Sequence, residues 1–421
     1  MCISILPLKA VPGRPCRADS SSTLPFAPDP LPFLPHPLPC NHLHARQSMD
    51  SLNQRAVDIL KGLGGCPATP FHEEKVARHI MKVLKPLGMD VRRDEYGNIV
   101  ARVRGNTAGA PPIAFVAHMD HPGYETIEAG PGLTVARAMG GVPPASYHKP
   151  TPVLVIMPDG RRVKATANPH ARANGDDRLV RIEPSEPVDI ASPAPVVFDL
   201  PDFVLDGDTI RMRAMDDLAG CAAITAMLER LAGGGADGDV YGVFTRAEEG
   251  GLFGARLMAQ DGTLPKETIV VSVESSPAIP GVAQGAGPVI RTGDAASTFV
   301  ADAEQVLIVA RDAIRQRNKE FKCQRQLMSG GTCEATAFAA FGYSVTGIAF
   351  PLGNYHNATT KIPDPDGGVG AEYINVSDFL GGVELITEAA GSVSKRGDTQ
   401  VRRWLREVQE DVRVRLRSTA G

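Results

Sequence analysis

Apolar residues follow helical and strand-like spacings in turn along most of the chain. Between residues 51 and 87 they recur three and four positions apart, as Ala56, Leu60 and Leu63 do, which predicts two helices. The continuous apolar run Ile113 to Ala117 is bounded by proline and by a polar cluster. Such a run is typical of a strand that is buried on both faces of a sheet.

The same alternation returns beyond residue 205. We expect helices at 218–231, 252–260, 304–318 and 376–393, and strands at 240–244, 268–273 and 344–350. Strands that alternate with helices are typical of a largely parallel sheet covered on both faces. The pattern therefore predicts an α/β fold with a mostly parallel mixed sheet flanked by helices.

Residues 122–205 interrupt this alternation with short Val-rich pieces separated by Gly, Pro and Asp. These pieces are 152–157, 162–165, 179–182 and 196–198. Short strands divided by turn residues indicate a small all-β barrel or sandwich, which here is inserted into the α/β domain. The α/β domain is then discontinuous and consists of residues 49–121 and 206–395.

The two ends of the chain differ from its middle. Ten of the 35 prolines fall within residues 1–48, which show no sustained period, and we expect this segment to be disordered. Residues 396–421 are expected to form a charged C-terminal tail.

Composition excludes several classes of partner. The net charge is −4 with no long basic run, which argues against nucleic-acid binding, and every apolar stretch is too short to cross a bilayer. The seven cysteines are scattered without a C-x-x-C pair, which favours a reducing compartment. We expect a cytoplasmic protein without a membrane partner.

Five short segments place acidic or imidazole side chains after a predicted strand or at a helix start. They are 117–120, 215–220, 245–251, 273–276 and 353–357. In open α/β sheets these positions surround the crevice in which ligands bind.

Each segment alone has an ordinary structural explanation. A lone His118 at a strand end is more often structural than a metal ligand. An Asp at 216 or 217 suits a helix N-cap, and an exposed loop would make the adjacent pair Glu248 and Glu249 harmless.

Taken together, the five segments supply two imidazoles, three coordinating carboxylates and one spare carboxylate. This set is sufficient for two metal ions about 3.5 to 4 Å apart that share one bridging acid. A nitrogen and oxygen set without cysteine suits Zn²⁺, with Co²⁺ or Mn²⁺ as other occupants.

The order of motifs resembles a known family. AHMD (117–120), MDDLAG (215–220), AEEGGLFGA (247–255), GGT (330–332) and a late histidine are similar to the dinuclear metallo-aminopeptidases that include glutamyl, deblocking and tetrahedral aminopeptidases. The resemblance extends from about residue 51 to about residue 394. It implies a zinc-peptidase-like fold for the α/β domain.

The resemblance also implies roles for individual residues. His118 and Glu274 would be terminal ligands of one metal, Glu249 and His356 would hold the other, and Asp216 would bridge them.

Two further carboxylates have implied roles beside the ligands. Glu248 would be the general base, and Asp120 would orient His118. Asp217 is expected to cap the helix that follows it.

Three positions depart from the family pattern. Glu274 stands where the family usually has Asp, Cys333-Glu334 follows GGT in place of Asp-Ala, and His121 replaces a frequent acid. These departures bear on the substrate more than on the metals.

The resemblance predicts a metal-dependent aminopeptidase that acts on peptides through a water activated by two metals. The alternatives are a dinuclear amidohydrolase that acts on N-acyl amino acids or dipeptides, and an inactive metal-binding homologue. The inserted domain (122–205) is expected to mediate homo-oligomerisation, as the corresponding insertion does in the family.

Overall fold

The computed structural model describes residues 41–130, 132–170, 178–360, 364 and 366–420. The chain divides into two units, Met1–Ser48 and Met49–Gly421, and the fold below is that of the second unit. The expected disorder of residues 1–40 lies outside the described residues. Residues 41–48 are helical, contrary to expectation: α1 (Asn41–Gly64) begins two residues after Pro39, the last proline of the N-terminal segment, so no proline interrupts it.

The main sheet has eight strands in the order β1-β2-β12-β3-β13-β16-β14-β15. The strands are β1 (Asp90–Arg93), β2 (Ile99–Val103), β3 (Ile113–His118), β12 (Val240–Thr245), β13 (Ile269–Pro277), β14 (Val289–Arg291), β15 (Gln324–Gln326) and β16 (Ser344–Leu352). The four central strands β12, β3, β13 and β16 are parallel to one another, whereas β2 and β14 pair with them antiparallel. The carboxyl ends of the central strands therefore lie at one edge of the sheet.

Strand β13 is longer than expected from the sequence. It pairs with β16 as far as Pro277 opposite Leu352, so Glu274 lies inside the strand rather than at its end. The sequence does not reveal this extension, because the polar residues Ser275 and Ser276 end the apolar run. Their backbone nevertheless continues the pairing with β16.

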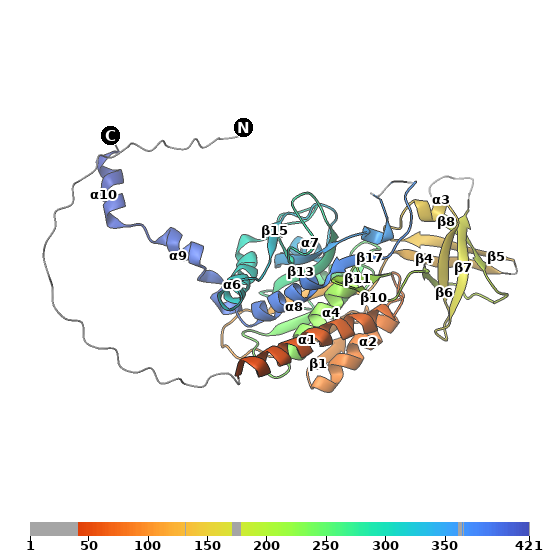
Figure 1. Ribbon diagram of the computed structural model, residues 1–421, viewed down its shortest axis with the longest axis horizontal. Helices are drawn as coiled ribbons and strands as arrows, with labels where there is room; N and C mark the ends of the chain where they lie inside the picture. The colour runs from red at the N-terminus through yellow and green to blue at the C-terminus, as the bar shows by residue number, and fades with distance from the viewer. Residues whose placement is uncertain (1–40, 131, 171–177, 361–363, 365, 421) are drawn as a thin grey trace, which may run out of the picture. The chain divides into compact units, whose positions relative to one another are not determined.

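Helices cover both faces of the sheet (Figure 1). Phe115 and Ala117 of β3 belong to the core cluster on one face, to which α1, α2 (Glu74–Leu84), α4 (Leu218–Leu231), α6 (Ala301–Arg317) and α8 (Val376–Ala390) contribute. Ala114 and Val116 belong to the opposite cluster, with α5 (Phe253–Gln260) and α7 (Glu334–Ala340). This alternation along one strand is the two-residue period of a β-strand. The α/β class expected from the sequence is confirmed.

Residues 123–198 form a closed barrel of six strands (Figure 1). Its strands follow the order β4 (Gly123–Gly130), β5 (Leu133–Met139), β8 (Leu179–Pro184), β7 (Arg162–Pro169), β6 (Thr151–Ile156) and β9 (Pro195–Phe198), and α3 (Ala145–His148) lies between β5 and β6. Strands β4 and β5 were not predicted, although charged residues such as Glu125 and Arg137 alternate there with buried ones. The barrel interior is a separate apolar core that includes Tyr124, Val155 and Phe198.

A small antiparallel sheet joins distant parts of the chain. It consists of β10 (Val204–Asp206), β11 (Thr209–Met212) and β17 (Glu372–Asn375). Beyond residue 395, the expected charged tail contains two short helices, α9 (Gln400–Arg406) and α10 (Glu410–Ser418). Across the described residues, no helix has both the length and the apolar character that a membrane span requires.

Candidate metal centre

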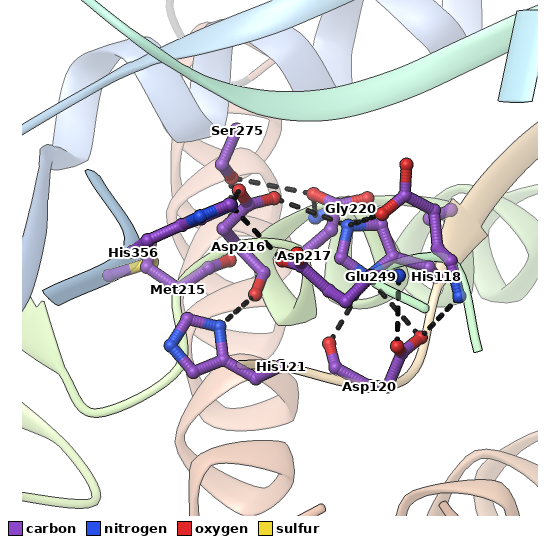
Figure 2. A network of polar contacts seen from close by, with 12 residues as sticks. His118, Asp120, His121, Met215, Asp216, Asp217, Gly220, Glu249, Ser275 and His356 are labelled. Atoms are coloured by element: carbon purple, nitrogen blue, oxygen red, sulfur yellow. Dashed lines mark hydrogen bonds and ion pairs between the residues drawn. The ribbon is translucent and has the colours of Figure 1, made fainter. Parts of the chain in front are cut away.

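Four of the predicted ligands, His118, Asp216, Glu249 and His356, lie close together (Figure 2). Three overlapping groups have donor atoms within 4.8 Å of one another: His118 with Asp216 and Glu274, His118 with Glu248 and Glu249, and Asp216 with Glu249 and His356. All five predicted ligands and the predicted base are therefore in one place.

Asp216 lies between the two histidines. Its Oδ1 is 3.3 Å from His118 Nε2, and its Oδ2 is 3.7 Å from His356 Nε2. His356 Nε2 is also 3.2 Å from Glu249 Oε1. One carboxylate thus faces both imidazoles, as a bridging ligand would.

The neighbouring Asp217 has a different role. It is the N-cap of α4, and its Oδ1 accepts a hydrogen bond of 3.1 Å from the Gly220 backbone N–H. The peptide bond between Asp216 and Asp217 is cis. Asp217 thus caps the helix, as expected, while Asp216 faces the cluster.

Asp120 contacts both His118 and the loop that carries the two glutamates. His118 Nδ1 is 3.1 Å from the Asp120 carbonyl oxygen and 3.6 Å from Oδ1 of its carboxylate. The same carboxylate accepts the backbone N–H groups of Glu248 at 3.0 Å and of Glu249 at 3.1 Å. Asp120 therefore positions the glutamate loop as well as the imidazole.

Sequence reasoning missed Glu372, a fully buried acid on β17. Its carboxylate accepts backbone N–H groups from Met215 at 2.7 Å, Asp216 at 2.9 Å and His356 at 2.8 Å. Glu372 thus ties two predicted ligands to the small sheet. One signal was available in the sequence. Glu372 and Ile374 are two positions apart, so in a strand both side chains point to the same, buried face.

His121 is a second missed contributor, although the sequence marked it as a departure from the family pattern. Its Nδ1 is 2.5 Å from the Asp216 carbonyl oxygen, and its Nε2 is 2.9 Å from Asn357 Oδ1. The imidazole therefore links the segment before α4 to the residue after His356.

The segment after the GGT motif contributes no donor to these three groups, although Glu334 lies close enough to Glu274 to affect its pKa. Glu334 is buried and accepts hydrogen bonds from Thr245 Oγ1 and Ser272 Oγ, both at 3.2 Å. Cys333 is fully buried, and burial raises the pKa of its thiol well above the ordinary value. Cys333 is the buried thiol expected from the sequence rather than a nucleophile.

Burial and crowding govern the protonation of the cluster. Burial raises the pKa values of the Glu248 and Glu274 carboxyls well above the ordinary range. Burial alone would lower the pKa of His356, but the adjacent Glu249 carboxylate raises it to about 9. The acids and imidazoles therefore stabilise one another's charged forms, whereas burial opposes both charges.

Three buried carboxylate oxygens in the cluster make no hydrogen bond of good geometry: Asp216 Oδ1, Glu249 Oε1 and Glu274 Oε1. The first two lie 3.3 and 3.2 Å from an imidazole nitrogen, and these contacts are ion pairs only where the imidazole is protonated. A buried carboxylate oxygen without a donor is destabilising unless a cation is bound to it. The donor set and these oxygens fit divalent metal ions with nitrogen and oxygen preferences.

Comparison with known proteins points the same way. Residues 180–364 match the M42 glutamyl aminopeptidase family. A putative aminopeptidase of Acetivibrio thermocellus is 25% identical over 354 residues, which cover 79% of this chain and 97% of that protein.

Two solved structures share the fold. The aminopeptidase APDkam598 from the archaeon Desulfurococcus kamchatkensis has 23% identity and a TM-score of 0.65, with 80% of this chain and 94% of that chain covered. The TET1 peptidase of Pyrococcus horikoshii, which assembles into a tetrahedron or a large octahedral shell, has 22% identity and a TM-score of 0.65 over 80% and 99% of the two chains. The resemblance predicted from the motifs is confirmed: the chain is similar to the M42 glutamyl aminopeptidases, and the comparisons support a metal-dependent aminopeptidase.

Proposed function

We propose that this chain releases N-terminal residues from peptides with two divalent ions, most simply Zn²⁺. The main support for this proposal is the position of Asp216. Its carboxylate lies between His118 and Glu274 on one side and Glu249 and His356 on the other. His118 and Glu274 would hold one ion, Glu249 and His356 the other, and Asp216 both. Such a pair of ions, when bound, polarises the scissile carbonyl and makes water a stronger nucleophile.

Glu248 is the proposed general base. It is not needed as a ligand in this assignment, and its Oε2 lies 3.9 Å from His118 Nε2. A carboxyl group with a raised pKa, in a cavity, is suited to accept a proton from the attacking water and to donate it to the leaving amine. Asp120 positions the backbone of Glu248, which fixes the carboxyl group relative to the ligands.

Two adjoining cavities offer space for a peptide. The first contains the cluster and measures about 300 Å³, and the second measures about 750 Å³. Tyr355 and His356 line both. A peptide held across these two residues would place its first residue on one side of the ligands and the remaining residues on the other.

The domain assignment follows from this function. Residues 49–121 and 206–395 would form the catalytic domain, and residues 122–205, which contain the barrel, would mediate a homo-oligomer. The support is the separate apolar core of the barrel and the large assemblies named for related structures, a dodecamer among them. Size measurement by light scattering, with and without residues 122–205, tests this assignment.

A screen of metal-depleted full-length protein tests the catalytic proposal. Zn²⁺, Co²⁺ or Mn²⁺ is added back, and aminoacyl p-nitroanilides are compared with their N-acetylated forms. We expect cleavage of the free-amine substrates only, with about two ions per chain. Preferential cleavage of the N-acetylated series would instead support the amidohydrolase alternative, which the comparisons do not favour.

A further inference from the structure

The C-terminal segment 400–420 carries exposed apolar side chains that the proposed function does not use. Of the sixteen large apolar side chains that are exposed in the described residues, seven lie in this segment. Trp404, the one tryptophan of the chain, is 71% exposed. Neither α9 nor α10 contains a buried residue. Exposed apolar side chains that gather in this way are typical of an interaction surface.

The apolar residues at the start of this segment share one side of a helix. Val401, Trp404 and Leu405 are three and four positions apart in α9, and Val408 continues this spacing just beyond its end. The arginines of α9 fall on the other side, at positions 402, 403 and 406. The helix is therefore amphipathic.

The apolar side continues into α10. A hollow of about 610 Å³ is lined by residues of both helices and of the segment between them, among them Trp404, Leu405, Val408 and Val412. Leu416 lies one helical turn beyond Val412. We call these side chains the apolar stripe: Val401, Trp404, Leu405, Val408, Val412 and Leu416.

The start of the segment is fixed to the α/β domain, whereas the stripe is not. Thr399 is 4% exposed and caps α9, because its Oγ1 accepts the Arg402 backbone N–H at 3.3 Å. Arg402 Nη2 donates to Asp302 Oδ1 of α6 at 2.9 Å. The arginine side of α9 thus contacts the domain where the helix begins, and the opposite, apolar side remains exposed.

Helices as short as these are not stable in water by themselves. α9 has 7 residues and α10 has 9, whereas isolated helices are marginal below roughly 12 to 15 residues. Most helical stability in proteins comes from packing of an amphipathic face against another surface. The exposed stripe therefore indicates that a surface from outside the chain covers it.

The charge of the segment indicates which kind of surface this is. Residues 400–421 contain six arginines and three acids, whereas the whole chain has a net charge of −4. In α10, Arg413 and Arg417 share one carboxylate, that of Glu410, at 3.8 and 3.9 Å. The stripe is therefore accompanied by an excess of positive charge, which an anionic surface would neutralise.

We propose that residues 400–420 bind the surface of a bilayer that contains anionic phospholipids. Such a surface supplies both complements at once, because its headgroups are acidic and the acyl region beneath them accepts apolar side chains. Tryptophan is favoured at this depth, since its ring is apolar and its N–H is polar. A helix that lies on a bilayer needs no apolar stretch of spanning length. This contact goes beyond the aminopeptidase activity and does not depend on it.

Trp404 makes the contact directly measurable, because its fluorescence is the only tryptophan signal of the chain. Full-length protein is titrated with vesicles of phosphatidylcholine alone, and with vesicles of phosphatidylcholine and phosphatidylglycerol in equal parts. With the mixed vesicles we expect the emission to shift to shorter wavelength. Binding should be at least about 10-fold stronger than to the neutral vesicles and should weaken as NaCl rises from about 0.05 to about 0.5 M.

One pair of variants tests the stripe, with vesicle co-sedimentation as the measurement. Leu405→Asp should weaken binding by at least about 10-fold, because it places a charge within the apolar side. The matched control is Leu205→Asp on β10, where the leucine is 50% exposed outside the segment, and its binding should equal that of wild type. The thermal unfolding midpoint of both variants should stay at the wild-type value.

A second pair tests the charge. The triple variant Arg413→Gln, Arg415→Gln, Arg417→Gln should bind the mixed vesicles about 100-fold more weakly, because three positive charges near the surface are lost. Arg413→Lys, Arg415→Lys, Arg417→Lys keeps these charges and should bind within about threefold of wild type.

Three results would overturn the proposal. The first is a wild type that does not bind the mixed vesicles at low salt. The second is binding that is unchanged in both Leu405→Asp and the triple Gln variant, which would place the lipid contact outside the segment. The third is a Trp404 emission that is already at short wavelength without vesicles and moves to longer wavelength on dilution, which would assign the stripe to a second copy of the chain.

Discussion

The barrel and the metal centre differ in whether their buried polar side chains have hydrogen-bond partners. In the barrel, Tyr124 donates to Ser146 Oγ at 2.5 Å, and Thr126 Oγ1 donates to the Ala191 carbonyl at 2.9 Å and accepts the Ala194 N–H at 2.8 Å. The described residues between 122 and 205 include no buried side-chain nitrogen or oxygen without a partner. At the sheet edge, Asp216, Glu249 and Glu274 each have such an oxygen.

This difference indicates that buried polar groups serve stability in the barrel and ligand binding in the metal centre. A buried polar group with partners stabilises the fold, whereas one without partners destabilises it. The cluster concentrates three such carboxylate oxygens, whereas elsewhere in the described α/β domain they are scattered, as at Thr268 Oγ1 and Thr346 Oγ1. The barrel is therefore expected to respond to mutation in stability, and the metal centre in activity.

The largest expected effect is the loss of activity in Asp216→Ala. Because one carboxylate faces both histidines, its removal should release both metals and reduce kcat/KM by about 10⁴-fold or more. Metal content by mass spectrometry and turnover measure this loss. The free energy of unfolding should stay close to that of metal-depleted wild type, because Oδ1 of Asp216 makes no hydrogen bond of good geometry and the substitution removes a buried charge from a crowded acidic cluster. A variant that unfolds more easily than the depleted protein would contradict the comparison.

Glu248→Gln should lower turnover by about 10²- to 10⁴-fold, because the amide keeps the shape of the side chain but cannot accept a proton. Metal content is expected to remain at the wild-type level. Glu249→Gln is the matched control on the next residue and should weaken one metal. Near-normal turnover in fully metallated Glu248→Gln would move the base to another residue.

Phe198→Ala tests the barrel in the same way. Phe198 is buried and packs edge-to-face on Tyr124, with ring centroids 5.9 Å apart. The substitution should reduce the free energy of unfolding by about 3 to 5 kcal/mol, whereas Phe198→Leu should reduce it by less than about 1.5 kcal/mol. Denaturant titration measures both, and kcat/KM per folded chain should stay within about twofold. A large loss of activity in the folded variant would show that the two regions are coupled.

The smallest expected effect comes from a surface ion pair that belongs to neither region. Arg93 donates to Glu74 at 2.8 and 3.2 Å and lowers the pKa of that carboxyl. A lowered pKa of an acid adds stability above its unfolded pKa, and this stability is lost as the pH falls through the folded value.

Wild type should therefore exceed Glu74→Gln by at most about 1 kcal/mol at pH 7, because the pair is exposed. The difference should decrease as the pH falls below the ordinary carboxyl range and vanish below the lowered pKa of Glu74, as followed by denaturant titration. A difference that persists in acid would indicate that Glu74 acts through packing rather than charge.

Local patterns in the sequence predicted much of the α/β domain. The helix predicted at 218–231 is α4 (Leu218–Leu231), and the strand predicted at 240–244 differs from β12 (Val240–Thr245) by one residue. Strands β4 and β14 and helix α7 escaped prediction. Short or charge-containing elements are specified by their pairing partners, which lie far away in the sequence.

The candidate ligands could also be predicted from the sequence. Imidazoles and acids follow apolar strands there, and their order along the chain is that of a known family. Their order along the chain identifies His118, Asp216, Glu249, Glu274 and His356 as a predicted set. It does not say which oxygens lack donors, which is a property of three-dimensional packing.

Tertiary structure alone decided the supporting residues. Glu372 is a single acid in a short strand, and its alternation with Ile374 is the one signal that the sequence offers for its inward position. The sequence does not show which groups surround it, whereas the fold buries Glu372 and gives its carboxylate three backbone donors. Apolar periodicity and residue type are local and can be read from the chain, whereas the desolvation of a charge depends on which distant segments pack around it.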